Sequence, residues 1–393
     1  MKFILFYTLL VLYVTLSCQS KKSLKEKKID QAFPIEKKEV FRGLVNCGNS
    51  CYINSILQNF LHMDGFIDFF LNYEETEFSG ETTKKLSRLF KGYYNLESKD
   101  PYNPEDLISH IWDSLGNEGE LFLARSQDDA ANFMSYLIGR LREENNLSLE
   151  DVKKQNIFSH KKFGKYSKRL YTPKFYFGDA ILSGLKRTIT RCYLNNYMVF
   201  EKTGSYELSE EFRLLTDEED ENKLISINEL LKNLSQTETR NELRCQEETY
   251  TDNNGTIQYR DAIEKDSVEV TPQYLFLPGE LSKQDGYLFI ILPRFKQDFD
   301  PLRMTVIPRK TNYPIDVNET IKLKSINKEK IYTFSGMVLH SGTLESGHYT
   351  AIVKSFNEDK FYHLNDSRVN LIKKEEVFKN NQRNAYILFY KEI

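Results

Sequence analysis

Two cysteines, four residues apart, stand directly before a strongly periodic apolar run in residues 43–60, GLVNCGNSCYINSILQNF. The apolar residues that follow the second cysteine recur with the spacing of one helix face: Ile53, Ile56, Leu57, Phe60 and Leu61. The spacing predicts a helix that begins near Ser50 or Cys51. The rest of the fold must therefore supply an apolar surface that this helix can pack against.

The residues before this helix predict a sharp turn, because Asn46, Gly48 and Asn49 tolerate the conformations of tight turns. Such a turn delivers Cys51 onto the first helical turn, where backbone N–H groups and the positive end of the macrodipole lower a thiol pKa. Cys47, within the turn, lacks that advantage. Free cysteine is among the most buried residue types, so Cys51 is a candidate nucleophile only if a base lies nearby.

Among the six histidines of the chain, His348 has the setting of such a base. Three apolar runs separated by polar turns predict an antiparallel meander over residues 334–339, 349–353 and 361–364. His348 stands at the start of the second strand, and Asn365 and Asp366 follow the end of the third. These two strand ends lie side by side in a meander, so Asn365 or Asp366 can reach His348. Cysteine, histidine and an orienting Asn or Asp are the parts of a cysteine-protease triad.

Five sequence blocks in a fixed order carry a more specific signal. They are GLVNCGNSCYINSILQ, SQDDAANFMSYLIGRL from Ser126, YLFIILPRF from Tyr287, HSGTLESGHYTAIV with YHLNDSRV, and NAYILFY from Asn384. The first resembles the cysteine box of the ubiquitin-specific proteases, and the fourth resembles their histidine box. The matches span residues 41 to 390, which is almost the whole chain.

The resemblance implies an α+β papain-like cysteine protease fold with thumb, fingers and palm subdomains. The chain of 393 residues exceeds the usual size of one domain, which fits one elaborated catalytic domain. We expect this domain over residues 40–393, with the thumb at about 40–165, the fingers at about 170–275 and the palm at about 276–393.

The same resemblance implies a role for each candidate site residue. Cys51 would attack the carbonyl carbon after the C-terminal glycine of ubiquitin, and His348 would act as base and then as acid. Asn365 aligns with the third triad member, while Asp366 would lie beside the oxyanion region or brace the turn. Asn46 matches the side-chain donor to the oxyanion; outside this motif it would be a turn residue bonded to nearby backbone. The expected partners are ubiquitin and ubiquitinated proteins.

Two other functions fit the same motifs: a catalytically silent relative that binds ubiquitin, and a protease for another ubiquitin-like modifier. The presence of every triad residue favours an active enzyme. Gly347 lets a thin substrate backbone pass beside His348, which suits a Gly-Gly tail. His340, on the preceding strand, fits packing or cleft lining better than base catalysis.

We expect no metal and no cofactor. Many ubiquitin-specific proteases hold zinc in the fingers through two Cys-x-x-Cys pairs, and a structural zinc requires four such ligands. Here Cys192 and Cys245 remain, but Asn195 and Glu248 stand where their partners would be. The five scattered cysteines, an odd number, predict no disulfide framework, which favours a reducing compartment.

Charge and the N-terminus bear on partners and location. The net charge of −3, without a basic cluster interleaved with aromatics, predicts no nucleic-acid binding. Residues 1–20 contain an uninterrupted apolar stretch at 3–18, which is short for a membrane span and long for the apolar h-region of a signal peptide. We therefore expect either a signal peptide or a signal anchor at 1–20, followed by a lysine-rich linker at 21–39. These lysines favour a cytosolic side for the catalytic domain. A glycosylation sequon at Asn365 weighs against secretion. We expect a cytoplasmic enzyme, with membrane association through residues 3–18 left open.

Overall fold

The computed structural model describes residues 39–77, 79–95, 100–118, 126–148, 150–151, 170, 175–216, 220–240, 245, 248–251, 257–259, 265–282, 284–300, 304–343 and 346–393. The chain divides into two units, Met1–Lys38 and Glu39–Ile393. The apolar stretch at 3–18 and the linker up to residue 38 lie outside the described residues. All structural statements below concern the second unit.

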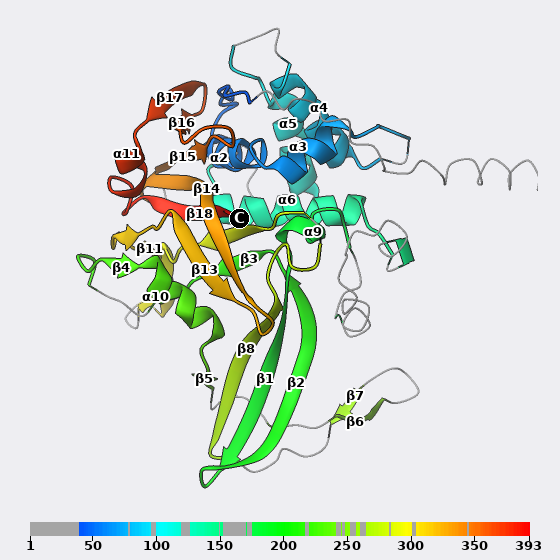
Figure 1. Cartoon of the computed structure of the whole chain (residues 1–393), viewed down its shortest axis with the longest axis vertical. Coiled ribbons are helices and arrows are strands. Elements are labelled where there is room, and N and C mark those ends of the chain that lie inside the picture. The colour runs from blue at the N-terminus through cyan, green and yellow to red at the C-terminus, as the bar shows by residue number, and fades with distance from the viewer. Residues whose placement is uncertain are drawn as a thin grey trace, which may run out of the picture. The chain divides into compact units, whose positions relative to one another are not determined.

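Helices form the N-terminal part of this unit (Figure 1): α2 (Cys51–Phe60), α3 (Asp64–Leu71), α4 (Glu81–Tyr93), α5 (Glu105–Glu118) and α6 (Ala130–Glu144). Helix α2 begins at Cys51, as the sequence predicted, and every one of its residues is buried. It packs against α6 and against three strands of the main sheet, so its apolar stripe and its polar residues are both enclosed.

The main sheet has eight strands in the order β17-β16-β15-β14-β18-β9-β3, with β13 paired to the end of β14. Its strands are β3 (Glu211–Arg213), β9 (Tyr287–Ile291), β13 (Thr320–Lys324), β14 (Glu329–Gly342), β15 (Gly347–Lys354), β16 (Phe361–Asn365), β17 (Arg368–Ile372) and β18 (Ala385–Glu392). All neighbours are antiparallel except β3 and β9. The predicted three-strand meander is confirmed as β14, β15 and β16.

The central strands of this sheet separate two apolar cores. Successive side chains of a strand point to opposite faces. Phe289 of β9 and Phe389 of β18 therefore join α2–α6 in one core, while Leu288 and Leu388 pack on the other face. Because β9 is covered on both faces, all five of its residues are buried. The sheet, packed on both faces, thus provides a rigid surface against which α2 packs.

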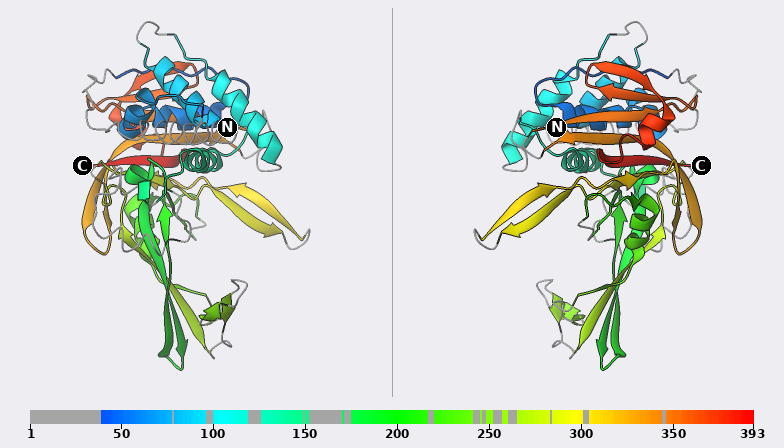
Figure 2. Two further views of the ribbon diagram at one scale, coloured as in Figure 1. Left: turned by 90° about the vertical axis from the view of Figure 1, so that its right-hand side faces the viewer. Right: turned by 90° about the vertical axis from the view of Figure 1, so that its left-hand side faces the viewer.

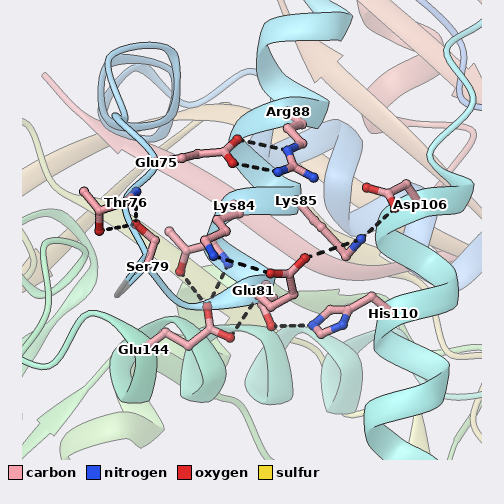
Figure 3. Close-up of polar contacts among 12 residues, drawn as sticks. Glu75, Thr76, Ser79, Glu81, Lys84, Lys85, Arg88, Asp106, His110 and Glu144 are labelled. Carbon is pink, nitrogen blue, oxygen red and sulfur yellow. Dashed lines mark hydrogen bonds and ion pairs between the residues drawn. The ribbon is translucent and has the colours of Figure 1, made fainter.

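A polar network fixes the helices around α4 (Figure 3). The Glu144 carboxylate, at the end of α6, accepts hydrogen bonds from the backbone N–H groups of Thr82 (3.0 Å) and Thr83 (2.8 Å) at the start of α4. These N–H groups have no partner inside the helix, so Glu144 caps α4 from a neighbouring helix. The Thr82 hydroxyl also lies 3.1 Å from His110 Nε2 of α5. Helices α4, α5 and α6 are thereby joined at one point.

A second, four-stranded sheet of order β2-β1-β8-β5 extends away from the helices (Figure 1). It consists of β1 (Gly184–Leu194), β2 (Tyr197–Ser209), β5 (Glu238–Thr239) and β8 (Ser267–Phe276). Asn195 and Asn196 close the β1–β2 hairpin with φ of 50° and 66°. Positive φ at both central residues is what a two-residue hairpin loop of type I′ requires, and asparagine adopts it readily.

The remaining described elements are short. They are α9 (Asp179–Leu182), β4 (Ile225–Ser226), α10 (Ile227–Lys232), η2 (Asn233–Ser235), β6 (Glu248–Thr251), β7 (Ile257–Tyr259), β10 (Phe295–Asp300), β11 (Thr305–Lys310), β12 (Ile315–Asp316) and α11 (Lys374–Phe378). Strands β10 and β11 form a hairpin that projects from the body (Figure 2). Within the described part of the chain, no helix is long and apolar enough to cross a membrane.

The four-stranded sheet corrects the expectation about cysteines. Cys192 of β1 and Cys245 form a disulfide with their Cα atoms 6.4 Å apart, and both are buried beside Val268. We expected no disulfide framework, and this one disulfide removes the argument from the cysteines for a reducing compartment. The count and spacing of cysteines do not show which ones the fold brings together. Thiols that are bonded to each other cannot bind zinc, and Asn195 lies in the hairpin turn. The residues of this sheet therefore do not fit a zinc site.

Candidate active site

The predicted turn before α2 is confirmed, and it is organised by one side chain. Gly48 and Asn49 have φ of 93° and 52°, and Cys51 follows as the first residue of α2. Asn46 Oδ1 accepts hydrogen bonds from the backbone N–H groups of Gly48 (2.9 Å) and Ser50 (3.3 Å). The Asn46 side chain therefore fixes the shape of the loop that presents Cys51.

His348 lies at the start of β15 and contacts Asn365 at the end of β16. Its Nε2 atom is 2.8 Å from Asn365 Oδ1. Because Oδ1 can only accept, Nε2 carries the hydrogen of this bond and Nδ1 is left as the acceptor in the neutral ring. Antiparallel pairing of β15 with β16 places the two residues together, as the sequence predicted. Of the two candidates, Asn365 and not Asp366 meets the imidazole.

Asp366 instead bridges the cysteine loop and helix α2. Its Oδ2 atom accepts a hydrogen bond from Asn46 Nδ2 at 2.9 Å, and its Oδ1 atom accepts one from Asn54 Nδ2 at 2.8 Å. The Asp366 backbone has a φ of 47°, in the left-handed region that aspartate tolerates better than most residues. This conformation turns its side chain away from His348 and toward the loop.

The cysteine loop lies directly on the β16–β17 turn. The Leu44 N–H donates to the Asp366 carbonyl oxygen at 2.9 Å. A Cβ atom at Gly43 would lie 2.3 Å from the Ser367 carbonyl carbon, so only glycine permits this approach. Segments from the two ends of the chain thus form one rigid assembly around Cys51.

Cys51 is only 2 % exposed, and its helix packs against β15. Burial raises its pKa, the backbone N–H of Tyr349 lowers it, and the negative charge of Asp366 raises it again. We expected the helix N-terminus to lower this pKa. The N–H groups of Tyr52 and Cys51 do act in that direction, but removal of the sulfur from water outweighs them.

His340 of β14 lies next to the start of β15, and it is 3 % exposed. Its ring packs 4.5 Å from that of Tyr349, and its Nε2 atom would be 2.0 Å from a Cβ atom at Gly347. Burial, with the positive charges of Lys310 and His348, lowers the pKa of His340 to about 4. The ring is therefore neutral near pH 7, which agrees with the expected packing role.

The sequence did not single out two polar residues that bind this assembly together. Asn54 donates to Asp366, and the Gln127 Oε1 atom, just before α6, accepts from the Gly347 N–H at 3.3 Å. Asn54 carries a signal that could have been used, because it is a polar residue within a helix that must be enclosed. Gln127 also carries a signal, because it is the second residue of the block SQDDAANFMSYLIGRL.

Comparisons with known proteins identify the family of the chain. Residues 42–390 match the family Ubiquitin carboxyl-terminal hydrolase. Ubiquitin carboxyl-terminal hydrolase 12 of Salmo salar is 27 % identical over 386 residues, which is 94 % of each chain. Ubiquitin carboxyl-terminal hydrolase 15 of Saccharomyces cerevisiae is 33 % identical over 106 residues, which is 24 % of this chain and 9 % of that relative.

Two solved structures of the SAGA Ubp8 DUB module have a similar fold. The structure with ubiquitin aldehyde has a TM-score of 0.63 at 19 % identity, over 98 % of this chain and 76 % of that one. The structure with monoubiquitin has a TM-score of 0.62 at 20 % identity, over 92 % and 72 %. With a family match over nearly its whole described length, the chain belongs to the ubiquitin carboxyl-terminal hydrolase family and has the α+β papain-like fold of ubiquitin-specific proteases.

Proposed function

We propose that this chain is a thiol-dependent deubiquitinase that hydrolyses the isopeptide or peptide bond after the C-terminal glycine of ubiquitin. Family membership supports the reaction and the substrate. The observation that carries the assignment of residues is the 2.8 Å contact of His348 Nε2 with Asn365 Oδ1. His348 lies on β15, which packs against α2 and whose Tyr349 N–H bonds to the Cys51 sulfur. This arrangement supports Cys51 as nucleophile, His348 as base and Asn365 as the residue that orients the base.

In the proposed reaction, His348 Nδ1 accepts the proton of the Cys51 thiol as the sulfur attacks the carbonyl carbon. Because burial raises the Cys51 pKa, the resting thiol is protonated at neutral pH and the reaction depends on this base. The imidazolium then gives the proton to the departing lysine amine, which leaves a thioester on Cys51. His348 next removes a proton from water, and the hydroxide releases the ubiquitin carboxylate.

The oxyanion of each tetrahedral intermediate would be bound by the backbone N–H of Cys51 and by Asn46 Nδ2. This nitrogen carries two hydrogens, and one of them bonds to Asp366. Asn46 therefore satisfies both interpretations of its motif, since its oxygen organises the turn and its nitrogen retains a hydrogen for the substrate. Loss of one such donor typically lowers the rate by ~10²–10³.

The test is incubation of the full chain with a ubiquitin that carries a C-terminal electrophile, followed by mass spectrometry of the adduct. We expect one ubiquitin on Cys51. An adduct on Cys47 would overturn the assignment of the nucleophile. A folded protein that binds ubiquitin without labelling would indicate a silent relative, and faster labelling by a probe built on another modifier would indicate a different substrate.

We also propose that the catalytic domain faces the cytosol, with residues 3–18 as a membrane tether. Lysines after the apolar stretch support this orientation. So does Asn365, because a glycan on this sequon would occupy the amide that contacts His348. Fusion of residues 1–28 to a reporter should place the reporter on a membrane, accessible from the cytosol. A cleaved, glycosylated reporter in the medium would contradict the proposal.

A further inference from the structure

We propose that Asn54 is a positioning residue for the hydrolysis: it fixes the Asp366 carboxylate, which in turn fixes the Asn46 amide for the oxyanion. This inference rests on the proposed function, because an oxyanion forms only if Cys51 attacks a carbonyl carbon. Asn54 lies three residues after Cys51 on α2, and its amide bonds to Val45 and Asp366.

The Asn54 side chain is a polar amide in a buried position. It is 2 % exposed, within a helix whose residues are all buried. A buried amide destabilises the fold unless it is hydrogen-bonded. Asn54 Nδ2 donates to Asp366 Oδ1 at 2.8 Å and to the Val45 carbonyl oxygen at 3.3 Å. Both acceptors belong to the assembly that surrounds Cys51.

The Asn54 amide has one possible orientation. Its Oδ1 atom is buried and has no hydrogen-bond partner among the residues that the structure describes. If the amide were turned over, Oδ1 would face the Asp366 carboxylate and the Val45 carbonyl, and three acceptors would meet. The charge-assisted bond to Asp366 therefore determines how Asn54 points, and Asn54 determines in return where Asp366 Oδ1 lies.

The Asp366 carboxylate holds Asn46 correctly only when both of its oxygens are engaged. Asn54 fixes Oδ1 from α2, and Asn46 bonds to Oδ2 from the cysteine loop. With Asn54 absent, the carboxylate can rotate about its terminal torsion, which has a broad energy minimum. Asn46 Nδ2 would follow Oδ2, and its remaining hydrogen would no longer point to the oxyanion.

A matched control lies on the same helix. Asn59 is 3 % exposed, and its Nδ2 atom donates to the Ser55 carbonyl oxygen at 2.9 Å and to the Met337 carbonyl oxygen at 3.5 Å. Neither bond reaches the Asp366 assembly. Asn59→Leu therefore removes a buried amide of the same kind without changing the residues around Cys51.

The experiment compares wild type, Asn54→Leu and Asn59→Leu on ubiquitin with a fluorogenic C-terminal amide. It also measures alkylation of Cys51 by iodoacetamide, a reaction that forms no oxyanion. We expect Asn54→Leu to lower kcat ~10–100-fold, because the donor is misplaced rather than removed. KM and alkylation should change less than ~3-fold. Asn59→Leu should keep kcat within ~3-fold, although both variants lower the melting temperature.

A third variant, Asn54→Asp, separates positioning from packing. When protonated, the introduced carboxyl can donate to Asp366 Oδ1, and two close carboxylates share a proton readily because repulsion raises one pKa. Its kcat relative to wild type should therefore rise as the pH falls from 8 to 6, whereas the ratio for Asn54→Leu stays constant. The titratable groups that feel the charge of Asp366, Cys47 and Cys51, are the same in all variants. So is His348, which contacts the neighbouring Asn365.

The outcomes separate this inference from the proposed function. An inactive wild type would refute the proposed function. An active wild type with unchanged kcat in Asn54→Leu would refute the positioning role. Equal losses of kcat and of alkylation would also refute it, since they would show damage to the nucleophile. A constant ratio for Asn54→Asp between pH 8 and 6 would show that the donor to Asp366 is irrelevant.

Discussion

The surroundings of Cys51 and the four-stranded sheet are held together in different ways. Around Cys51, side chains join segments that are distant in sequence: the bond of Asn46 to Asp366 spans 320 positions. In the four-stranded sheet, backbone pairing of β1 with β2 and β8 and one disulfide join the strands, and side-chain bonds such as Arg187 to Gln273 link residues on adjacent strands. The first region requires particular residue types at particular positions, whereas the second depends mainly on strand pairing and a few turn residues.

Exposure sharpens this contrast. All of α2 is buried, but Tyr197 and Met198 at the tip of the β1–β2 hairpin are 77 % and 54 % exposed. A change near Cys51 therefore disturbs several contacts at once, while a change at the hairpin tip disturbs few. Substitutions in the first region should affect catalysis strongly, and those in the second should affect stability with little effect on the chemical step.

The largest expected effect is the loss of the nucleophile. Cys51→Ala should lower hydrolysis of a fluorogenic ubiquitin amide by at least ~10³-fold, because no other group can form the thioester. His348→Ala should be nearly as damaging. Cys47→Ala should keep most of the activity, since the hydrogen bonds of its sulfur go to the Val45 carbonyl oxygen (3.7 Å) and to Asn103 Oδ1 (3.6 Å). Equal losses from Cys47→Ala and Cys51→Ala would leave the nucleophile unassigned.

The next effect concerns the residue that orients His348. Asn365→Ala should lower kcat by ~10–10², because the imidazole loses its 2.8 Å partner while the helix terminus and the base remain. Asn365→Asp should retain substantial hydrolysis, because a carboxylate oxygen can accept the same N–H. The measurement is steady-state kinetics with the fold checked by circular dichroism. If Asn365→Ala is harmless and folded Asp366→Ala is inactive, Asp366 is the orienting residue.

The site could be predicted from the sequence because its chemistry restricts residue types. Cys51 needs a helix start, and glycine and asparagine before it indicate the turn. His348 and Asn365 stand at strand ends, so their contact follows from the pairing of β15 with β16. Apolar residues recur with a period of 3.6 in a helix and of two in a strand, and these patterns are visible in the sequence. The predicted helix after Cys51 and the predicted meander are both present at the expected residues.

Other features could not be predicted, because they depend on distances between segments. The Cys192–Cys245 disulfide depends on the path of the chain between β5 and β6. Strand β17 has mostly exposed residues, so it lacks the apolar alternation that reveals a strand. The raised pKa of Cys51 reflects burial by β15, which the local helix geometry does not show.

The disulfide should influence stability more than catalysis. Removal of the disulfide, by Cys192→Ala with Cys245→Ala or by a reductant, should lower the free energy of unfolding by about 2–4 kcal/mol relative to the oxidised chain. The reason is that a cross-link between residues 53 positions apart restricts the unfolded state. The kcat should stay within ~2-fold, since the bond lies in the four-stranded sheet and does not touch the Asp366 assembly. Thermal unfolding measures the change in stability, steady-state kinetics measures kcat, and thiol counting shows whether the disulfide is present. A chelator should change neither quantity, and stoichiometric zinc would contradict the disulfide.

The smallest expected effect is that of His340, which lies beside the active site but is used for packing. Its pKa is lowered to about 4 by burial, so the folded protein keeps this ring neutral where the unfolded chain protonates it near 6.5. The unfolded state therefore gains protons, and stability falls, as the pH drops from about 6.5 to 4. This loss should reach about 1–2 kcal/mol at pH 5.

His340→Ala should remove that part of the pH dependence and leave most of the hydrolysis at pH 7.5. Thermal melts of both proteins between pH 7 and 4.5 give the difference, in which the buried His62, with its own lowered pKa, cancels. A difference that does not change with pH would show that His340 is solvated in the folded state. A loss of kcat as large as that of His348→Ala would instead place His340 among the groups that move protons, and the contrast between chemistry and packing within β14 and β15 would fail.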